Sequence, residues 1–220
     1  MTEPIVIAFF DLDKTIIRTN SAKGWVRREF RDGHLRFRDL VKASGWLFLY
    51  GLGKSDLEDS IRSGAVLLQG VQEQDIRNRC REYWEETVRF EVREDARHAL
   101  EKHRALGHVL VLLTSTSNYL ADLVAEELNI RHVLCNRFQA EDGVLTGETV
   151  EPLCFGKGKV FYAQEFAKQL GCSLDNCYFY TDSFSDVPVL RIVGHPVVVT
   201  PDARLKREAK NNGWTVEEWA

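Results

Sequence analysis

The stretch Ile5-Val-Ile-Ala-Phe-Phe-Asp-Leu-Asp-Lys-Thr15 decides the fold of this chain. Its first six residues are apolar. A short run of β-branched and aromatic side chains predicts a strand buried on both faces of a sheet. Asp11 and Asp13 follow where that strand should end. The stretch therefore predicts a buried strand that delivers two carboxylates to the edge of a sheet.

Beyond residue 94 the sequence alternates between predicted helices and strands. Helices are expected at 95–106, 118–128, 159–170 and from 202 onward, and strands at 109–113, 132–135, 177–181 and 196–200. The pair Asp142-Gly143 suits a tight turn, which predicts a hairpin over 138–146. This alternation predicts an α/β fold, a doubly wound, mostly parallel Rossmann-like sheet with helices on both faces.

The segment between the first strand and this alternating region has a different pattern. Residues 21–88 show no convincing strand pattern and are expected to be helical. The segment is too long for a connection and has apolar content of its own. We therefore predict a catalytic core formed by residues 1–18 and 90–220, with residues 19–89 inserted as a helical cap domain.

The composition and charge of the chain limit the classes of molecule that it is expected to bind. A hydrophobic content of 44% with 28% charged residues is typical of a folded globular protein. The formal net charge of -4 gives no basic field for nucleic acid. We see no secretory signal and no apolar segment long enough to span a bilayer. The five cysteines include no C-x-x-C pair, so reduced thiols and a cytoplasmic location are expected.

Polar side chains follow three of the predicted strands. Asp11 and Asp13 follow the first, Thr114-Ser-Thr-Ser117 follows the second, and Asp182 and Asp186 follow the strand at 177–181. Ligands of open α/β sheets bind beyond the carboxyl ends of the strands. We therefore expect these side chains to converge on one site.

The chemistry of the carboxylates favours a magnesium site. Asp11 and Asp13 leave the same side of an extended chain, and crowded carboxylates resist joint ionisation without a cation. Mg²⁺ prefers hard oxygen ligands together with a phosphate, and no His or Cys adjoins these positions to favour zinc. Taken alone, the two aspartates could instead be turn or helix-capping residues.

With all three strand ends taken together, the sequence resembles the haloacid dehalogenase superfamily. Within it, the sequence is similar to the phosphoserine-phosphatase-like branch, subfamily IB, which has a helical cap after the first motif. The four motifs are found in order at Ala8–Thr15, at Val111–Thr114, at Lys159 and at Asp182 with Asp186. The resemblance covers nearly the whole chain.

The resemblance implies a phosphatase mechanism and a role for each motif residue. Asp11 would attack phosphorus to give an aspartyl-phosphate, and Asp13 would serve as acid and then base. Mg²⁺ would be held by Asp11, the Asp13 carbonyl and Asp182, with Asp186 supporting the metal or orienting Lys159. The phosphoryl-binding residues implied by the resemblance are Thr114, Ser115 and Lys159.

Several positions leave alternatives open. Lys157 lies two residues before Lys159, and either lysine could be a solvated residue at a helix start. Thr114 could simply close its strand. Lys14 occupies a position that is often small in the family. Asn20 occupies the position at which the similar phosphoserine phosphatases carry a glutamate that binds the substrate amine. This difference disfavours phosphoserine as the substrate.

Aromatic and basic side chains of the predicted cap are candidates for lining the crevice: Trp25, Arg27, Arg28, Trp46, Phe48, Tyr50 and Arg62. They could equally form the core of the cap itself. The leading hypothesis is hydrolysis of a small phosphomonoester. The alternatives are phosphotransfer to an acceptor other than water, and a non-catalytic binding protein on the same fold.

Overall fold

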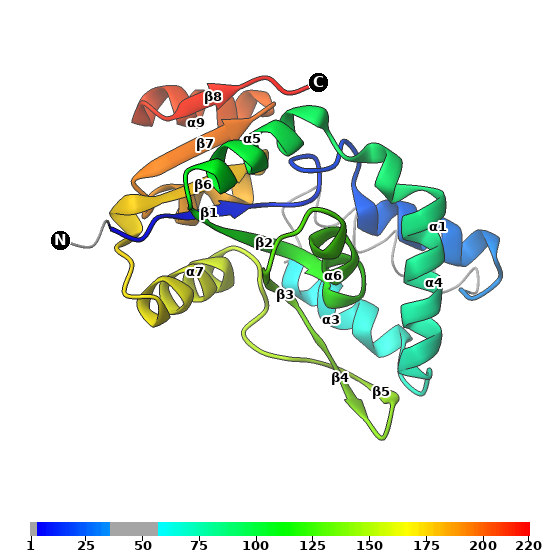
Figure 1. Ribbon diagram of the computed structural model, residues 1–220. Coiled ribbons are helices and arrows are strands. Elements are labelled where there is room, and N and C mark those ends of the chain that lie inside the picture. The colour runs from blue at the N-terminus through cyan, green and yellow to red at the C-terminus, as the bar shows by residue number, and fades with distance from the viewer. Residues whose placement is uncertain (1–3, 36–56) are drawn as a thin grey trace.

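The computed structural model describes residues 4–35 and 57–220, and a six-stranded sheet is its central element (Figure 1). The strand order is β3-β2-β1-β6-β7-β8, and every neighbouring pair is parallel. The strands are β1 (Ile7–Phe10), β2 (Val109–Ser117), β3 (His132–Asn136), β6 (Cys177–Thr181), β7 (His195–Val199) and β8 (Thr215–Glu217). The predicted α/β sheet is confirmed.

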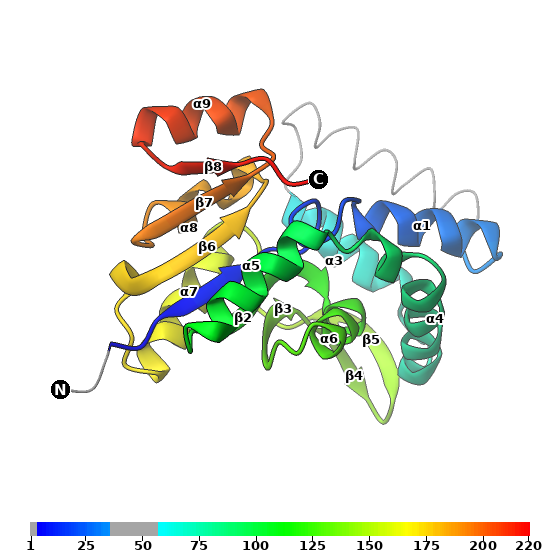
Figure 2. The same cartoon turned by 45° about the horizontal axis from the view of Figure 1, so that its top comes forward.

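Helices cover both faces of this sheet (Figure 2). The helices are α5 (Glu94–Ala105), α6 (Asn118–Glu127), α7 (Lys157–Gln169), α8 (Val187–Leu190) and α9 (Ala203–Asn212), with 3-10 turns at Val88–Glu91, Leu174–Asn176 and Phe184–Asp186. One apolar cluster joins α5 and α6 to the sheet, and a second joins α7, α8 and α9 to its other side. This is the doubly wound arrangement.

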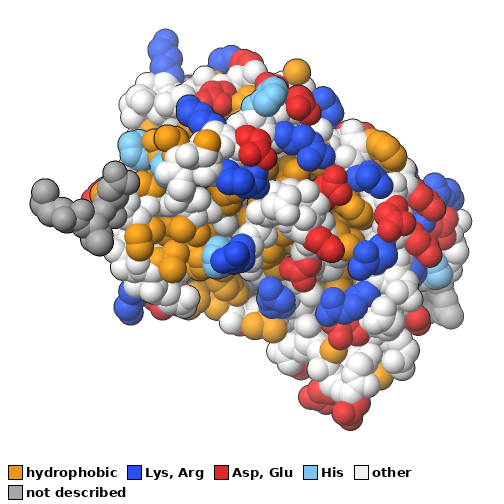
Figure 3. All heavy atoms as spheres, viewed as in Figure 1, with side chains coloured by type: hydrophobic (Ala, Val, Ile, Leu, Met, Phe, Trp, Pro, Cys, Tyr) orange, Lys and Arg blue, Asp and Glu red, His pale blue; other side chains and the backbone are white. Residues whose placement is uncertain are grey.

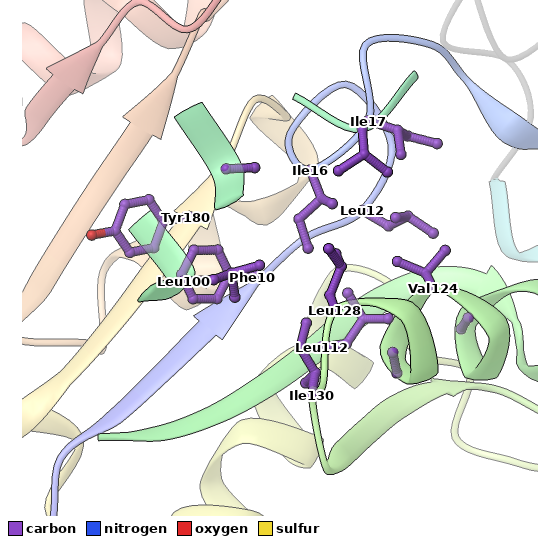
Figure 4. Close-up of a cluster of buried hydrophobic side chains, with 14 of the residues drawn as sticks. Phe10, Leu12, Ile16, Ile17, Leu100, Leu112, Val124, Leu128, Ile130 and Tyr180 are labelled. Carbon is purple, nitrogen blue, oxygen red and sulfur yellow. The ribbon is translucent and has the colours of Figure 1, made fainter. Parts of the chain in front are cut away.

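The central position of β1 explains its sequence. All four of its residues are buried, because β2 and β6 flank it and helices cover both of its faces. Phe9 contributes to one apolar cluster and Phe10 to the other. The ring of Phe10 stacks on Tyr180 of β6 with centroids 4.5 Å apart (Figure 4). Because β1 is a central strand, Asp11, which follows it, lies near the middle of the row formed by the carboxyl ends of the strands.

Several element boundaries differ from the sequence-based expectation. The final helical stretch ends at Asn212, because Gly213 adopts the left-handed conformation (φ 68°) and stops the helix, and β8 follows at the sheet edge. β2 continues to Ser117 instead of ending at residue 113, and α7 begins at Lys157 instead of 159. The central residues expected for each helix and strand are correct.

The insertion after β1 is helical where it is described, in α1 (Ser21–Arg31), α3 (Leu57–Leu67) and α4 (Glu73–Glu86). The expected hairpin is formed by β4 (Phe138–Glu141) and β5 (Val144–Thr149). It joins the insertion, since Gly70 N–H donates to the Leu145 carbonyl and Leu145 N–H to the Val71 carbonyl, both at 2.9 Å. The limits 19–89 for a separate cap domain remain a prediction.

The surface has mixed charge. Basic and acidic side chains alternate over the face seen in Figure 3, in keeping with the small net charge. None of the helices in the described residues has the length and apolar character needed to cross a membrane.

Candidate active site

The carboxyl end of β1 brings Asp11 against a buried lysine. The Asp11 N–H donates to the Tyr180 carbonyl at 2.9 Å, which continues the β1–β6 ladder one residue beyond the strand. Asp11 is buried, and its side chain is 9% exposed. Lys159 Nζ, in the first turn of α7, lies 2.9 Å from Asp11 Oδ1 and 2.8 Å from Asp186 Oδ2. Residues from β1, α7 and the end of β6 therefore meet at one point.

Asp186 has one occupied and one free carboxylate oxygen. Its Oδ2 accepts from Lys159 and, at 2.7 Å, from the hydroxyl of Thr181. Its Oδ1 is buried and has no hydrogen-bond partner among the described residues. A buried acceptor normally has a partner, so this oxygen is available to a bound ion or water.

Asp13 contacts the first helix of the insertion. Its Oδ1 accepts the backbone N–H of Ser21, the first residue of α1, at 2.9 Å. Asn20 caps the same helix by accepting the Lys23 N–H at 2.9 Å. The start of α1 is therefore attached to the half-buried Asp13 side chain.

Asp182 follows β6 and Thr114 lies in β2, the two strands that flank β1. The Asp182 N–H donates to the hydroxyl of Thr15 at 3.0 Å, which ties the loop after β6 to the loop after β1. Thr114 is buried in β2, and its Oγ1 accepts the Thr116 N–H at 3.2 Å. Ser115 beside it is half-buried.

The electrostatics of the site are those of crowded, buried acids. Burial raises the pKa of Asp11 to about 7, and the nearby charges of Asp186 and Asp182 act in the same direction against the lowering effect of Lys159. Burial likewise raises the pKa of Asp182 to about 6 and raises that of Asp13. For Lys159, burial opposes the charge, but Asp11 and Asp186 outweigh it and raise the pKa.

These groups fit a hard divalent cation. Among residues 4–35 and 57–220, no three His, Cys, Asp or Glu side chains are grouped closely enough to hold a metal unaided. Backbone carbonyls and water are ordinary ligands of Mg²⁺, however, which needs only one or two carboxylates. Burial and, to a smaller extent, the neighbouring carboxylates raise the pKa values of Asp11 and Asp182, and Asp186 Oδ1 has no hydrogen-bond partner among the described residues. A bound cation would stabilise the ionised form of these carboxylates.

The sequence-derived site residues divide into those in direct contact and those on adjacent strand ends. Lys159, Asp11 and Asp186 form one ion-paired group, and Lys157 is exposed. Asp13 and Asp182 belong to the loops around this group, and Thr114 and Ser115 to the last part of β2. Sequence reasoning missed the supporting roles of Thr15, Thr181 and Ser21; a threonine four residues after Asp11 was the available signal for Thr15.

The expected cap-lining residues have other partners where they are described. Arg28 pairs with Glu86 at 2.7 Å, and Arg62 with Glu151 at 3.0 Å. Trp25 is half-buried against Tyr83, and Arg27 is exposed. Trp46, Phe48 and Tyr50 lie outside the described residues.

Comparison with known proteins connects this geometry to a family. The family of haloacid dehalogenase-like hydrolases matches residues 8–191. A probable phosphatase of Mycobacterium tuberculosis is 34% identical over 95% of this chain and 74% of its own length. A phosphoserine phosphatase of the same organism is 28% identical over 96% and 70%. A histidinol-phosphatase of Neisseria meningitidis is 26% identical over 96% and 97%.

Solved structures share the fold. A protein of unknown function from Bordetella pertussis has a TM-score of 0.89 at 24% identity, covering 97% of this chain and 98% of that one. A phosphoserine phosphatase with a phospho-aspartyl intermediate analogue has a TM-score of 0.70 at 17% identity, covering 94% and 91%. At these identities the likeness extends to the fold alone.

Proposed function

The chain belongs to the haloacid dehalogenase-like hydrolase family and is a hydrolase, and on this premise we propose that it hydrolyses a small phosphomonoester through an aspartyl-phosphate. The observation that carries the proposal is the contact of Lys159 with both Asp11 and Asp186 in a buried site. Phosphoryl transfer requires mainly positioning and charge stabilisation, which this group offers.

Asp11 is the proposed nucleophile. An oxygen of its carboxylate attacks phosphorus in line, and the bond from phosphorus to the leaving oxygen breaks. The attack requires the ionised carboxylate, which the adjacent Lys159 ammonium favours. Water then attacks the aspartyl-phosphate and releases phosphate, regenerating Asp11.

Asp13 is the proposed acid and base. It gives its proton to the leaving oxygen and then takes a proton from the attacking water. A pKa raised by burial suits a carboxyl group that must hold a proton in the first step. The Ser21 N–H at 2.9 Å holds one Asp13 oxygen and leaves the other for this exchange.

The phosphoryl oxygens would contact Thr114, Ser115 and Lys159. Asp11, the Asp13 carbonyl and Asp182 would hold Mg²⁺. Asp186 Oδ1 would be free to accept a hydrogen bond from a water molecule that supports the metal. When bound, Mg²⁺ supplies positive charge that neutralises the phosphoryl oxygens and the crowded carboxylates. We further infer that residues 19–89 act as a cap, since α1 begins against Asp13.

The substrate is a small phosphorylated compound. Relatives are named for phosphoserine and for histidinol phosphate. Asn20 is uncharged, and its side-chain oxygen caps α1. An ammonium group therefore gains no carboxylate partner at this position, which disfavours phosphoserine. Transfer to an acceptor other than water uses the same residues and is the second candidate.

Phosphate release from p-nitrophenyl phosphate tests the reaction. We expect turnover that requires Mg²⁺ and is lost in Asp11→Asn. Asp142→Asn is the matched control, because it makes the same change in the exposed hairpin turn and should keep full turnover. Robust turnover by Asp11→Asn would overturn the mechanism. Adding alcohols and looking for new phosphate esters separates hydrolysis from phosphotransfer.

A further inference from the structure

Asn136, the last residue of β3, connects two segments that carry the proposed phosphoryl-binding groups. It is 2% exposed. Its Nδ2 donates to the Ser115 carbonyl at 2.6 Å, and its Oδ1 accepts the Cys154 N–H at 2.7 Å. Ser115 follows Thr114, and Cys154 lies five residues before Lys159. One buried side chain therefore bridges the last part of β2 and the loop before α7.

The two partners fix the orientation of the Asn136 amide. A backbone carbonyl can only accept, so the group facing Ser115 must be the NH₂ group. A backbone N–H can only donate, so the group facing Cys154 must be the oxygen. The assignment of nitrogen and oxygen therefore follows from the partners themselves.

The contact with Ser115 sets the direction of one peptide group. The Ser115 carbonyl and the Thr116 N–H belong to the same planar trans peptide, so they point in opposite directions. Holding the carbonyl toward Asn136 turns the N–H the other way, and it donates to Thr114 Oγ1 at 3.2 Å. Asn136 therefore determines that the N–H of this peptide, and not its carbonyl oxygen, is directed toward Thr114.

This direction has a consequence for the Thr114 hydroxyl. Because Thr114 Oγ1 already accepts the Thr116 N–H, its own hydrogen is available for donation to another acceptor. An anionic phosphoryl oxygen is such an acceptor. The reversed peptide would turn the Ser115 carbonyl oxygen toward Thr114 instead and would repel a phosphoryl group.

The hydrogen bond from the Cys154 N–H to Asn136 holds the loop before α7 in place. The backbone folds back tightly here, because a Cβ added at Gly158 would lie 1.7 Å from the Leu153 carbonyl oxygen. The Cys154 thiol also reaches the Leu134 carbonyl of β3 at 3.4 Å. β3 therefore anchors the loop from which α7 starts, and α7 carries Lys159.

We propose that Asn136 is a positioning residue that holds the Ser115–Thr116 peptide, and with it the Thr114 hydroxyl, in the orientation that binds a phosphoryl group. The proposal rests on the proposed phosphatase function of the same site. Asn136 acts through Thr114 and Thr116, while the carboxylates of the metal site have other supports.

Asn136→Asp tests the proposal. The carboxylate keeps an acceptor for the Cys154 N–H but places a second oxygen against the Ser115 carbonyl, which removes the donor and adds repulsion. The inhibition constant of inorganic phosphate should rise by about tenfold or more. The Mg²⁺ concentration for half-maximal activity should stay within about twofold of the wild type. Gln139→Glu is the control: it removes an amide donor to the Thr149 carbonyl in the hairpin and should change neither quantity.

The smaller, uncharged Asn136→Ser provides the same test if the aspartate variant does not fold, and its phosphate affinity should also fall. Direct titration with inorganic phosphate, well below each melting temperature, separates positioning from general loosening. Equal phosphate affinity in wild type and a folded variant overturns the proposal. So does a parallel loss of Mg²⁺ and phosphate affinity. A wild type that binds no phosphate refutes the proposed function itself.

Discussion

The backbone N–H of Ser21 donates to Oδ1 of Asp13 across 2.9 Å, so the first residue of α1 holds the side chain proposed as acid and base. The hydroxyl of Ser21 is buried, and both this hydroxyl and the backbone N–H act to lower the pKa of Asp13 against the effect of burial. The N-terminal end of a helix favours a negative charge. The insertion therefore contributes to the site through a backbone group, which no side-chain motif reveals.

Replacing Ser21 with proline removes this donor with little change to the helix. Proline is favoured at the first helical position, and Asn20 already has the extended conformation that a following proline requires (φ -97°, ψ 108°). Ser21→Pro should lower kcat by about tenfold, because Asp13 loses a positioning hydrogen bond. The comparison variant Ser21→Ala keeps the N–H and removes only the hydroxyl, so its kcat should fall less than that of Ser21→Pro. Similar kcat values for the two variants would refute the role of the N–H.

Mg²⁺ should stabilise the folded protein. Binding to the native state at about 100 times the dissociation constant adds about 2.7 kcal/mol, or about 5–10 °C in melting temperature for a chain of this size. Asp182→Asn should remove most of this shift, whereas Asp142→Asn should keep it. Thermal unfolding with and without Mg²⁺ measures the effect. A full shift in Asp182→Asn would exclude Asp182 as a ligand.

His103 should make stability depend on pH away from the active site. Burial, with the charges of His108 and Lys102, lowers its pKa to about 4, and its Nε2 lies 3.0 Å from the Tyr180 hydroxyl. Between pH 4 and 6.5 the unfolded chain binds this proton and the folded chain does not. Stability from His103 is therefore present above about pH 6.5 and is lost as the pH falls toward 4.

Denaturant unfolding at pH 7 and pH 5 in the presence of Mg²⁺ measures this loss. His103→Gln should be less stable than wild type at pH 7 but should lose less on acidification, by on the order of 1–2 kcal/mol. Equal losses in the two proteins would show that His103 does not carry the effect.

The sequence predicted the sheet well because its central strands are apolar and end in polar residues. β1 is buried on both faces, and its composition shows this directly. β8 was missed because three residues at a sheet edge, two of them exposed, carry no apolar pattern, and only Gly213 indicated the break. Its pairing with β7 is a tertiary contact, which local sequence does not encode.

The candidate site was predictable where a charged side chain follows a strand. The sequence favoured Lys159 over Lys157 but left the alternative open, because the choice depends on which face of the first turn of α7 is directed toward β1. Asn136 gave no signal, since a single asparagine after a short strand is ordinary in a loop. Its importance comes from two backbone groups, at Ser115 and Cys154, that lie 21 and 18 residues away.

The buried charges around Lys159 should be interdependent. Lys159→Met leaves Asp11 and Asp186 buried without their cation, which should cost about 3–5 kcal/mol of stability in the absence of Mg²⁺ and should abolish turnover. Adding Asp186→Asn removes one of the unpaired charges while keeping an acceptor for Thr181. The double variant should therefore regain part of the lost stability but none of the turnover. Denaturant unfolding and phosphate release measure the two properties. If the second substitution lowers stability further, then repulsion between Asp11 and Asp186 is not the source of the cost.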